Sequence, residues 1–271
     1  MEYRTIKPKI LNYREFRFRR ASEDDCSELI DHDLTIAFEG EEEPRCVYKT
    51  DVNTEGLLSA VSNIKLPKTT RTSGLVTTSR IFGYSPRNMI RNAPCKATSL
   101  AEESPQEHGS LVHGAEIASK VYKEHAPIQH KAHSKMTENY VLPEYRLGNS
   151  PFTSGIVNEN NPLLYHFDQG NYPNVWSAMF SFKDGIEGGN LCAPVLDMKF
   201  ATNNNSVILF DGQGLLHGVT PIVKRRKDAK RFTIVYYSLK NMWSCEAYQD
   251  EIEAMKASRT QTELEKARKL K

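Results

Sequence analysis

The sequence predicts an α+β protein in which an antiparallel jelly-roll core is flanked by helices and preceded by an N-terminal extension. Between about residues 152 and 240, short runs of β-branched and aromatic residues alternate with Gly, Asn and Asp clusters typical of turns. No helical periodicity separates these runs, which favours an antiparallel arrangement over a parallel sheet with crossover helices. The strand candidates are Trp176–Phe182, Leu191–Pro194, Ser206–Phe210 and Phe232–Leu239.

Other segments are expected to surround this core. Residues 1–50 mix basic and acidic stretches, and we interpret them as an extension packed on the core. The core domain, 51–245, should carry helical support near 54–64, behind a Thr54 cap, and at 114–125, ending before Pro127. Residues 65–110 are rich in Thr, Ser, Pro and Gly, which predicts loops and short strands. Residues 246–271 are charged and should form a surface helix.

Composition and cysteine pattern indicate an intracellular protein. The 271 residues suffice for a sizeable core, and the five cysteines contain no CxxC pair, so neither a disulfide framework nor a zinc knuckle is expected. Residues 1–20 lack the apolar region of a signal peptide, and no window approaches the roughly 18 apolar residues of a membrane span. We therefore expect a monomer, not secreted and without a membrane partner, in the nucleus or cytoplasm or made by a virus in its host cell. The net charge of +2 does not by itself suggest a polyanion partner.

A candidate metal site begins with His166 and Asp168, which are two residues apart. In an extended strand such residues project from the same face and can reach one ion. His217, which follows the strand candidate Ser206–Phe210 and a Gly-rich turn, is the third candidate ligand. Two imidazoles and one carboxylate leave room on the metal for a bidentate acid and dioxygen, as in non-haem iron(II) oxygenases.

Arg231 is the candidate anchor for an acidic co-substrate. A planar, permanently charged guanidinium can bind both oxygens of a carboxylate, which a lysine cannot do. Arg231 opens the next strand candidate, and Thr233 shares its strand face and could add a hydroxyl bond. Asn158 and Asn160 precede the His-x-Asp motif and are expected either to reach the other end of the co-substrate or to build a turn.

A single His-x-Asp motif is weak evidence, because about one occurs by chance in a chain of this size. The order of the features strengthens it: the motif, a Gly-Gly turn, an apolar strand, His-Gly-Val, and then Arg-x-Thr on a further strand. The competing interpretation makes His166 and His217 polar rim residues of an inert jelly roll and Arg231 a solvated surface charge. Burying His and Asp on a core face costs free energy unless a partner such as a metal compensates, which favours the metal site.

Residues 152–240 resemble the double-stranded β-helix dioxygenases, and several stretches resemble the branch that contains the TET enzymes and the base-J-binding proteins. The stretches are Asn158–Pro162, Gly188–Leu191 and Phe210–Gln213 through His217–Val219. The resemblance implies an iron(II)- and 2-oxoglutarate-dependent dioxygenase that uses dioxygen and oxidises the 5-methyl group of thymine or 5-methylcytosine, with DNA as partner. The chain lacks the Cys-rich insert of the animal enzymes, so a small viral, protist or fungal relative fits better.

Two basic clusters are candidates for contact with nucleic acid. Lys224, Arg225 and Arg226 begin a basic run that should form a hairpin beside the metal site, where it could neutralise phosphates or be a solvated tip. A second cluster interleaves arginines with Phe82 and Tyr84, a mixture that suits phosphate contact and base stacking but could equally be a loop clamped on the core. Its arginines are Arg80, Arg87 and Arg91.

Alternatives remain open at this stage. The five histidines between 108 and 133 could form a second metal site, but their irregular spacing favours ordinary surface histidines. The same dioxygenase could act on a free nucleoside, a small metabolite or a peptide side chain. The chain could also be a non-catalytic jelly-roll module that binds nucleic acid.

Overall fold

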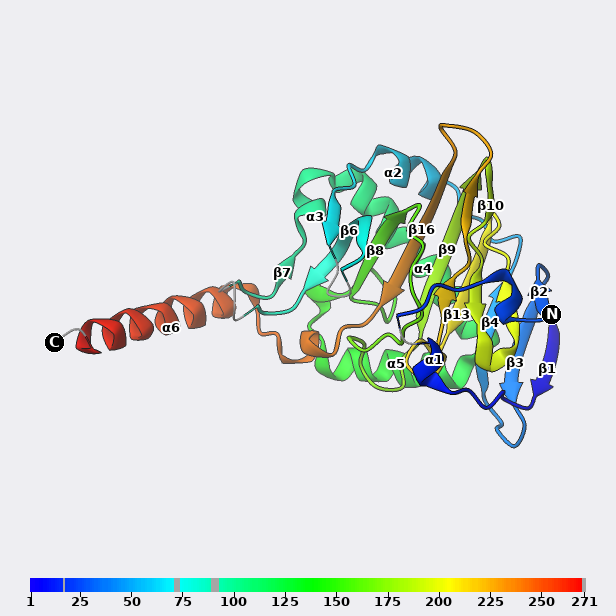
Figure 1. The fold of residues 1–271 in the computed structure, drawn as a ribbon. Coiled ribbons are helices and arrows are strands. Elements are labelled where there is room, and N and C mark those ends of the chain that lie inside the picture. The colour runs from blue at the N-terminus through cyan, green and yellow to red at the C-terminus, as the bar shows by residue number, and fades with distance from the viewer. Residues whose placement is uncertain (17, 71–73, 89–92, 270–271) are drawn as a thin grey trace.

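Two β-sheets form the centre of the molecule (Figure 1). The structure, a computed structural model, describes residues 1–16, 18–70, 74–88 and 93–269. In this described part the larger sheet has ten strands, and β7 (Lys96–Ala97) pairs with β6 at one side. The other nine run in the order β1 (Glu2–Ile6), β3 (Leu34–Phe38), β4 (Pro44–Lys49), β13 (Ser206–Phe210), β9 (Ser177–Asp184), β16 (Lys230–Tyr237), β8 (Ser154–Glu159), β6 (Val76–Ser85) and β5 (Lys68–Thr70).

A smaller sheet faces the larger one and completes the jelly roll. Its strands run in the order β14 (Gly218–Val219), β11 (Leu191–Ala193), β12 (Met198–Phe200) and β2 (Glu28–Ile30). A separate pair, β10 (Ile186–Gly188) and β15 (Ile222–Lys224), is also antiparallel. The pairing is antiparallel throughout except for β1 with β3 and β2 with β12, where the N-terminal segment adds a parallel strand to each sheet. Residues 1–50 are thus hydrogen-bonded into both sheets.

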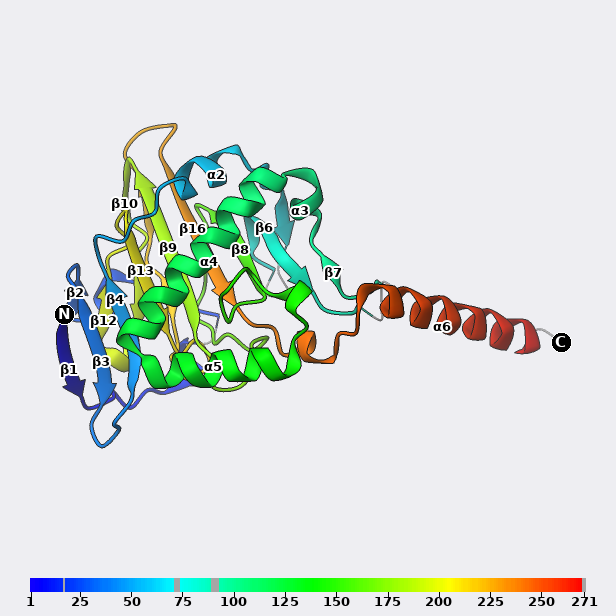
Figure 2. The ribbon, with the colours of Figure 1, turned by 180° about the vertical axis from the view of Figure 1, so that it is seen from behind.

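Helices cover the back of the larger sheet (Figure 2). They include α2 (Leu57–Asn63), α3 (Ser99–Glu103), α4 (Pro105–His125) and α5 (Pro127–Tyr140). The main hydrophobic core lies here, because alternate residues of β9, such as Phe180 and Phe182, point towards the helices while their neighbours point to the front. Tyr122 of α4 stacks on Trp176 with ring centroids 5.3 Å apart. α6 (Tyr248–Lys269) projects away from the body, and the short α1 (Tyr13–Phe16) lies in front of the sheet.

Strand expectations were met more closely than helix expectations. β13 has the predicted bounds, and β9, β11 and β16 lie within two residues of theirs. The helix expected at 54–64 starts only at Leu57, because Gly56 has a left-handed backbone with φ of 81°. The segment expected to hold loops and short strands contains the ten-residue β6 as well as α3 and the start of α4. The surface helix expected over 246–271 is α6.

Helix α5 was not foreseen, and its histidines are not all at the surface. Pro127 does end α4 at His125, but it also occupies the first turn of α5, where its missing N–H is no loss. His133 on α5 is fully buried, and its Nε2 lies 2.7 Å from Ser238 Oγ. Burial lowers the pKa of His133 to about 3, so this side chain is neutral. The interpretation of the whole stretch as surface histidines is therefore wrong for this residue.

The cysteine expectation also needs a correction. Cys95 and Cys245 form a disulfide with an S–S distance of 2.04 Å, although 150 positions separate them in the sequence. It ties the segment after β6 to the segment before α6. Near it, Arg87 donates two hydrogen bonds, of 2.6 and 2.8 Å, to the buried carboxylate of Glu251 on α6. Spacing alone did not reveal this pair, because the chain brings the two cysteines together only in the folded state.

No helix in the described part of the chain is long and apolar enough to cross a membrane.

Candidate metal centre and anion pocket

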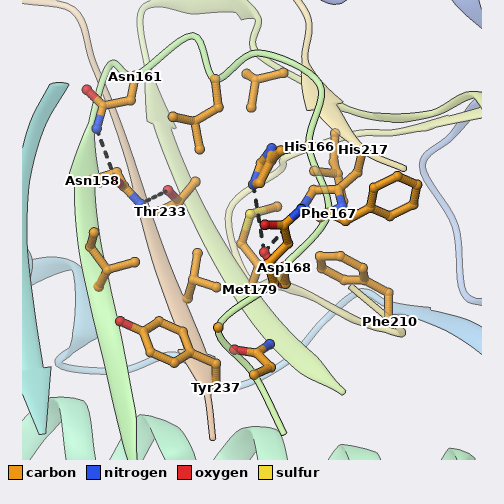
Figure 3. Close-up of a pocket in the computed structure, with 18 of the residues that line it drawn as sticks. Asn158, Asn161, His166, Phe167, Asp168, Met179, Phe210, His217, Thr233 and Tyr237 are labelled. Atoms are coloured by element: carbon orange, nitrogen blue, oxygen red, sulfur yellow. Dashed lines mark hydrogen bonds and ion pairs between the residues drawn. The ribbon is translucent and has the colours of Figure 1, made fainter. Parts of the chain in front are cut away.

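Three side chains from two separate segments converge in front of the larger sheet (Figure 3). His166 and His217 form an isolated antiparallel bridge, with backbone N···O distances of 3.0 and 3.1 Å. Asp168 Oδ1 lies 3.7 Å from Nε2 of each histidine. One ligand atom from each residue lies within 4.8 Å of the others, so a single ion can be bound by all three. The sequence-predicted metal ligands are thus brought together.

The other atoms of these ligands are already engaged. His166 Nδ1 donates to Leu164 O at 2.9 Å, and His217 Nδ1 donates to Leu215 O at 2.8 Å. A carbonyl can only accept, so Nδ1 carries a proton in each ring and Nε2 is the nitrogen that faces Asp168 and is placed to bind a metal. Both hydrogen bonds orient the rings before any ion arrives.

Asp168 is held in the same manner. Its Oδ2 accepts a hydrogen bond of 2.7 Å from Ser177 Oγ on β9, which leaves Oδ1 to face the histidines. Asn171 Nδ2 in turn donates to Ser177 Oγ at 3.0 Å. Gly212 makes room for the carboxylate, since a Cβ there would lie 2.2 Å from Asp168 Oδ2. None of these three supporting residues was identified from the sequence.

The His-x-Asp motif does not lie on a regular strand, which differs from the expectation. It belongs to a loop between β8 and β9 that is fixed by single contacts, including Asp168 N to Gly212 O at 2.8 Å. The loop is nevertheless extended at the bridge, where His166 pairs with His217. The same-face argument therefore reached the right residues, although the strand itself is reduced to one bridge.

Arg231 is the most unusual side chain of the site. It is 1% exposed, so the interpretation of a solvated surface charge is wrong. Within the described residues, its Nε and Nη2 have no hydrogen-bond partner. Burial lowers the pKa of Arg231 to about 10, which still leaves it charged at neutral pH. A buried cation with unused donors is costly unless an anion binds to it.

The surroundings of Arg231 add positive charge and exclude water. Lys183 is its direct partner across the β9–β16 pairing, and burial together with the charge of Arg231 lowers the pKa of Lys183. The turn at Gly189, with φ of 67°, packs against the guanidinium, since a Cβ there would lie 2.8 Å from Arg231 Cδ. This close approach explains why a glycine occupies position 189 of the Gly-Gly turn. Lys183 was missed because its place beside Arg231 depends on strand register.

The polar neighbours of Arg231 divide into two groups. Asn158 and Thr233 line the same cavity, and Asn158 Nδ2 donates to Thr233 Oγ1 at 3.3 Å. Asn161, which was not singled out, donates to Asn158 Oδ1 at 3.0 Å. Asn160 does not line the cavity; its Oδ1 accepts from the backbone N–H of Arg231 at 2.9 Å, and its φ is 50°. Asn160 therefore builds a turn, as one of the two expectations had it, and does not contact a co-substrate in this cavity.

One cavity of about 460 Å³ joins the metal ligands to Arg231. This volume lies in the range of pockets for small molecules. Between the two charged ends the wall is mostly apolar, and at the far end Tyr237 and Leu239 complete the lining. The apolar part of the wall includes Ile156, Leu163, Met179, Leu191, Val219 and Val235. The arrangement can hold an ion and an acid together while limiting the access of water.

The cations proposed for nucleic acid are mostly paired with acids. Within the described residues, Arg225 forms an ion pair with Glu187, and Arg226 forms ion pairs with Asp184 and Asp228 at the tip of the β15–β16 hairpin. In this part of the chain Lys224 forms none, and none of the three lines the cavity.

The second basic cluster is engaged in the same manner. Arg80 contacts Glu103 at 2.5 Å, and Arg87 is held by the buried Glu251. Arg91 lies outside the described residues. Phe82 is fully buried, which supports a cluster fixed on the core, although Arg80 and Phe82 lie on strand β6 and not on the expected loop.

Comparison with known proteins gives a consistent result. A family model for the oxygenase domain of the 2OGFeDO superfamily, Tet_JBP, matches residues 80–240. The bifunctional helicase and thymine dioxygenase JBP2 of Trypanosoma brucei brucei (strain 927/4 GUTat10.1) is 29% identical over 161 residues, which are 58% of this chain and 14% of JBP2. Thymine dioxygenase JBP1 of Trypanosoma brucei brucei is 27% identical over 167 residues, 60% of this chain and 19% of JBP1. The chain thus spans less than a fifth of the length of these relatives.

A solved structure, NgTET1 in complex with 5mC DNA, is similar with a TM-score of 0.62 at 14% sequence identity. The similarity covers 88% of this chain and 89% of that one. At this identity it establishes the fold, and the predicted jelly-roll core is confirmed.

Proposed function

Because the chain belongs to the Tet/JBP oxygenase-domain family of the 2OGFeDO superfamily, we propose that it is an iron(II)- and 2-oxoglutarate-dependent dioxygenase that hydroxylates the 5-methyl group of thymine or 5-methylcytosine in DNA. The observation that carries the proposal is the buried, unsatisfied guanidinium of Arg231 in the same cavity as the His-Asp-His set. An inert jelly roll would have no use for either feature.

The donor set fits iron(II). Two neutral imidazoles and one carboxylate are the ligands of the iron oxygenases that keep coordination positions open for substrate and oxygen. His166, Asp168 and His217 would hold the iron, which with 2-oxoglutarate and dioxygen would supply the oxidising chemistry. The protein's own contribution is orientation, through the carbonyl bonds to both rings and the Ser177 bond to Asp168.

Arg231 suits the distal carboxylate of 2-oxoglutarate. Its planar fork offers two parallel N–H donors to one carboxylate, and Thr233 can add a hydroxyl from the same strand face. Lys183 and Arg231 together make this end of the cavity the attractive one for a dianion. The apolar wall between the two ends excludes water, which strengthens the ionic contact.

The names of the similar proteins support a pyrimidine substrate. Two relatives are called thymine dioxygenases, and the similar solved structure contains 5mC DNA. A base in a duplex must leave the helical stack to reach a metal at the bottom of a cavity. Tyr237 and Leu239 line the end of the cavity away from Arg231 and would face such a base.

Two measurements test the proposal. Succinate release should require iron(II), 2-oxoglutarate and a methylated-pyrimidine DNA, and it should be lost in His166→Ala and Asp168→Ala. Mass spectrometry of nucleosides from treated DNA should then show hydroxymethylated pyrimidine. If succinate is released while thymine and 5-methylcytosine stay unchanged, the substrate is instead a free nucleoside, a metabolite or a peptide. A protein that binds neither metal nor co-substrate would be a non-catalytic module.

A further inference from the structure

An N-terminal strap, defined here as residues 7–20 without residue 17, packs directly on the metal-binding loop. The ring of Tyr13 meets the ring of Phe167, which stands between the two ligands of the motif, at a centroid distance of 5.6 Å. Phe16 packs in the same edge-on manner on Tyr165 at 5.1 Å. The backbone of the strap is also tied to this loop, through a bridge of Arg20 with Leu164. Phe167 also lines the cavity of the metal site, so the strap packs on the wall of that cavity. Figure 1 shows α1, which is part of the strap, in front of the larger sheet.

Several cations around the strap carry uncompensated charge. Arg14 and Arg20 are exposed, and neither forms an ion pair with another described residue; the same holds for Lys224. The neighbouring strap residues Lys9 and Arg19 do form ion pairs, with Asp197 and Asp25. The strap thus contains paired cations that fasten it and unpaired ones that face solvent.

Two of these unpaired cations line a separate pocket that adjoins the cavity of the metal site. Arg20 and Lys224 line a second pocket of about 250 Å³. Val219 lines both this pocket and the cavity of the metal site, so the two adjoin. This pocket adjoins the Arg231 side of the cavity, because Asn160 lines it and accepts a hydrogen bond from the backbone N–H of Arg231 at 2.9 Å.

An exposed aromatic ring accompanies the charge. Tyr13 is 49% exposed. Unpaired cations beside an exposed ring suit single strands and distorted duplexes, because phosphates can bind the cations and a base can stack on the ring.

We propose that the strap and Lys224 form the DNA-binding surface of this enzyme, with Arg14, Arg20 and Lys224 on phosphates of the bound DNA and Tyr13 stacked on one of its bases. The proposal rests on the proposed function for its DNA substrate. Of the cations that the sequence suggested for phosphates, the proposal keeps Lys224 and leaves out the arginines of the hairpin tip and of the cluster at Arg80. Those arginines already have carboxylate partners, so a phosphate would have to displace an acid.

Fluorescence anisotropy with a labelled thymine-containing DNA tests the surface, using full-length protein with bound metal and N-oxalylglycine. The triple variant Arg14→Gln, Arg20→Gln, Lys224→Gln should lower DNA affinity by about tenfold or more and reduce the salt slope by about three, because each phosphate contact contributes about one. The matched control neutralises three exposed lysines without ion pairs among the described residues, on the opposite, helical face: Lys120, Lys123 and Lys131.

The proposed stacking of Tyr13 on a base is tested by separate variants. Tyr13→Ala should weaken DNA binding severalfold, while Tyr13→Phe, which keeps the ring, should bind as the wild type does. N-oxalylglycine affinity should stay unchanged in all strap variants, which shows that the metal loop remains folded.

Equal loss of affinity in the strap and control triples, or none in the strap triple, would overturn the proposal. So would a wild-type protein whose DNA binding is independent of salt. A protein that binds DNA through the strap but oxidises no base would leave this surface standing and refute the proposed reaction instead.

Discussion

Replacing Arg231 with methionine should have opposite effects on the ligand-free protein and on the complex. Burial lowers the pKa of Arg231 to about 10 from 12.5, which corresponds to about 3 kcal/mol of unfavourable free energy for the charged form. A base with a lowered folded-state pKa destabilises the fold at every pH below that pKa, so the cost is fully present at neutral pH. Methionine removes the charge and retains much of the apolar volume.

The ligand-free variant should therefore gain about 1 to 2 kcal/mol, since some packing on Gly189 is lost, and unfold a few degrees higher. The complex should lose much more. Truncating one partner of a buried, hydrogen-bonded ion pair costs about 2 to 5 kcal/mol, which predicts N-oxalylglycine binding weakened by about thirtyfold to several thousandfold. The N-oxalylglycine affinity of Arg231→Lys should lie between those of the wild type and Arg231→Met, because lysine retains the charge but cannot donate two parallel hydrogen bonds.

Isothermal titration of the manganese-loaded protein with N-oxalylglycine measures the binding change, and thermal unfolding without ligand measures the stability change. Manganese affinity serves as the control, because Arg231 is not a metal ligand and should leave it unaltered. The reasoning is wrong if Arg231→Met binds N-oxalylglycine as tightly as the wild type does. It is also wrong if the ligand-free variant unfolds at a lower temperature, since Arg231 would then be stabilised by partners within the protein.

Three further changes probe separate parts of the structure. Ser177→Ala should lower metal affinity by about 10- to 100-fold, measured by competition with a chelator, because the carboxylate of the metal-ligand aspartate loses its orienting hydrogen bond; an unchanged affinity would show that the bond is dispensable. Gly189→Ala should weaken N-oxalylglycine binding in calorimetry, whereas Gly40→Ala, with a similar φ of 82° but no atom within 4 Å, should only reduce stability. Glu251→Gln should destabilise the fold by about 2 kcal/mol at neutral pH, because hydrogen bonds from the partly exposed Arg87 hold the pKa of this carboxyl at about 2, below its usual 4.5. That difference, measured by denaturant unfolding, should shrink as the pH falls from 4.5 towards 2.

Strands and metal ligands were predictable because local patterns encode them. Phe180 and Phe182 alternate with Ser181 and Lys183 at the period of a strand. This pattern can be recognised without knowing which strands lie next to it. His166, Asp168 and His217 were found by residue type and order, which the chemistry of the metal restricts strongly. Both inferences require only nearby residues or a rule about ligands.

Features that depend on distant neighbours were missed. The sequence does not reveal that Cys95 meets Cys245, or that Arg87 is neutralised by Glu251, because each pair forms only when β6 and α6 are in place. The same limit applies to the choice of DNA-binding cations. A sequence does not show which arginines are paired with carboxylates, because those pairs form only in the folded chain.

The register between β9 and β16 is the physical link between fold and function. Ile234 of β16 and Phe180 of β9 pair on the helical side, while Arg231 and Lys183 pair on the front, so one pair of strands forms both the core and the anion pocket. A slip of β16 by one residue would exchange its two faces, turning Arg231 towards the apolar helices and Phe232 towards the metal. Burial of the aromatic face therefore specifies the register that holds the guanidinium in the cavity. It follows that substitutions in the helix-facing core of these strands should impair co-substrate binding without touching the site.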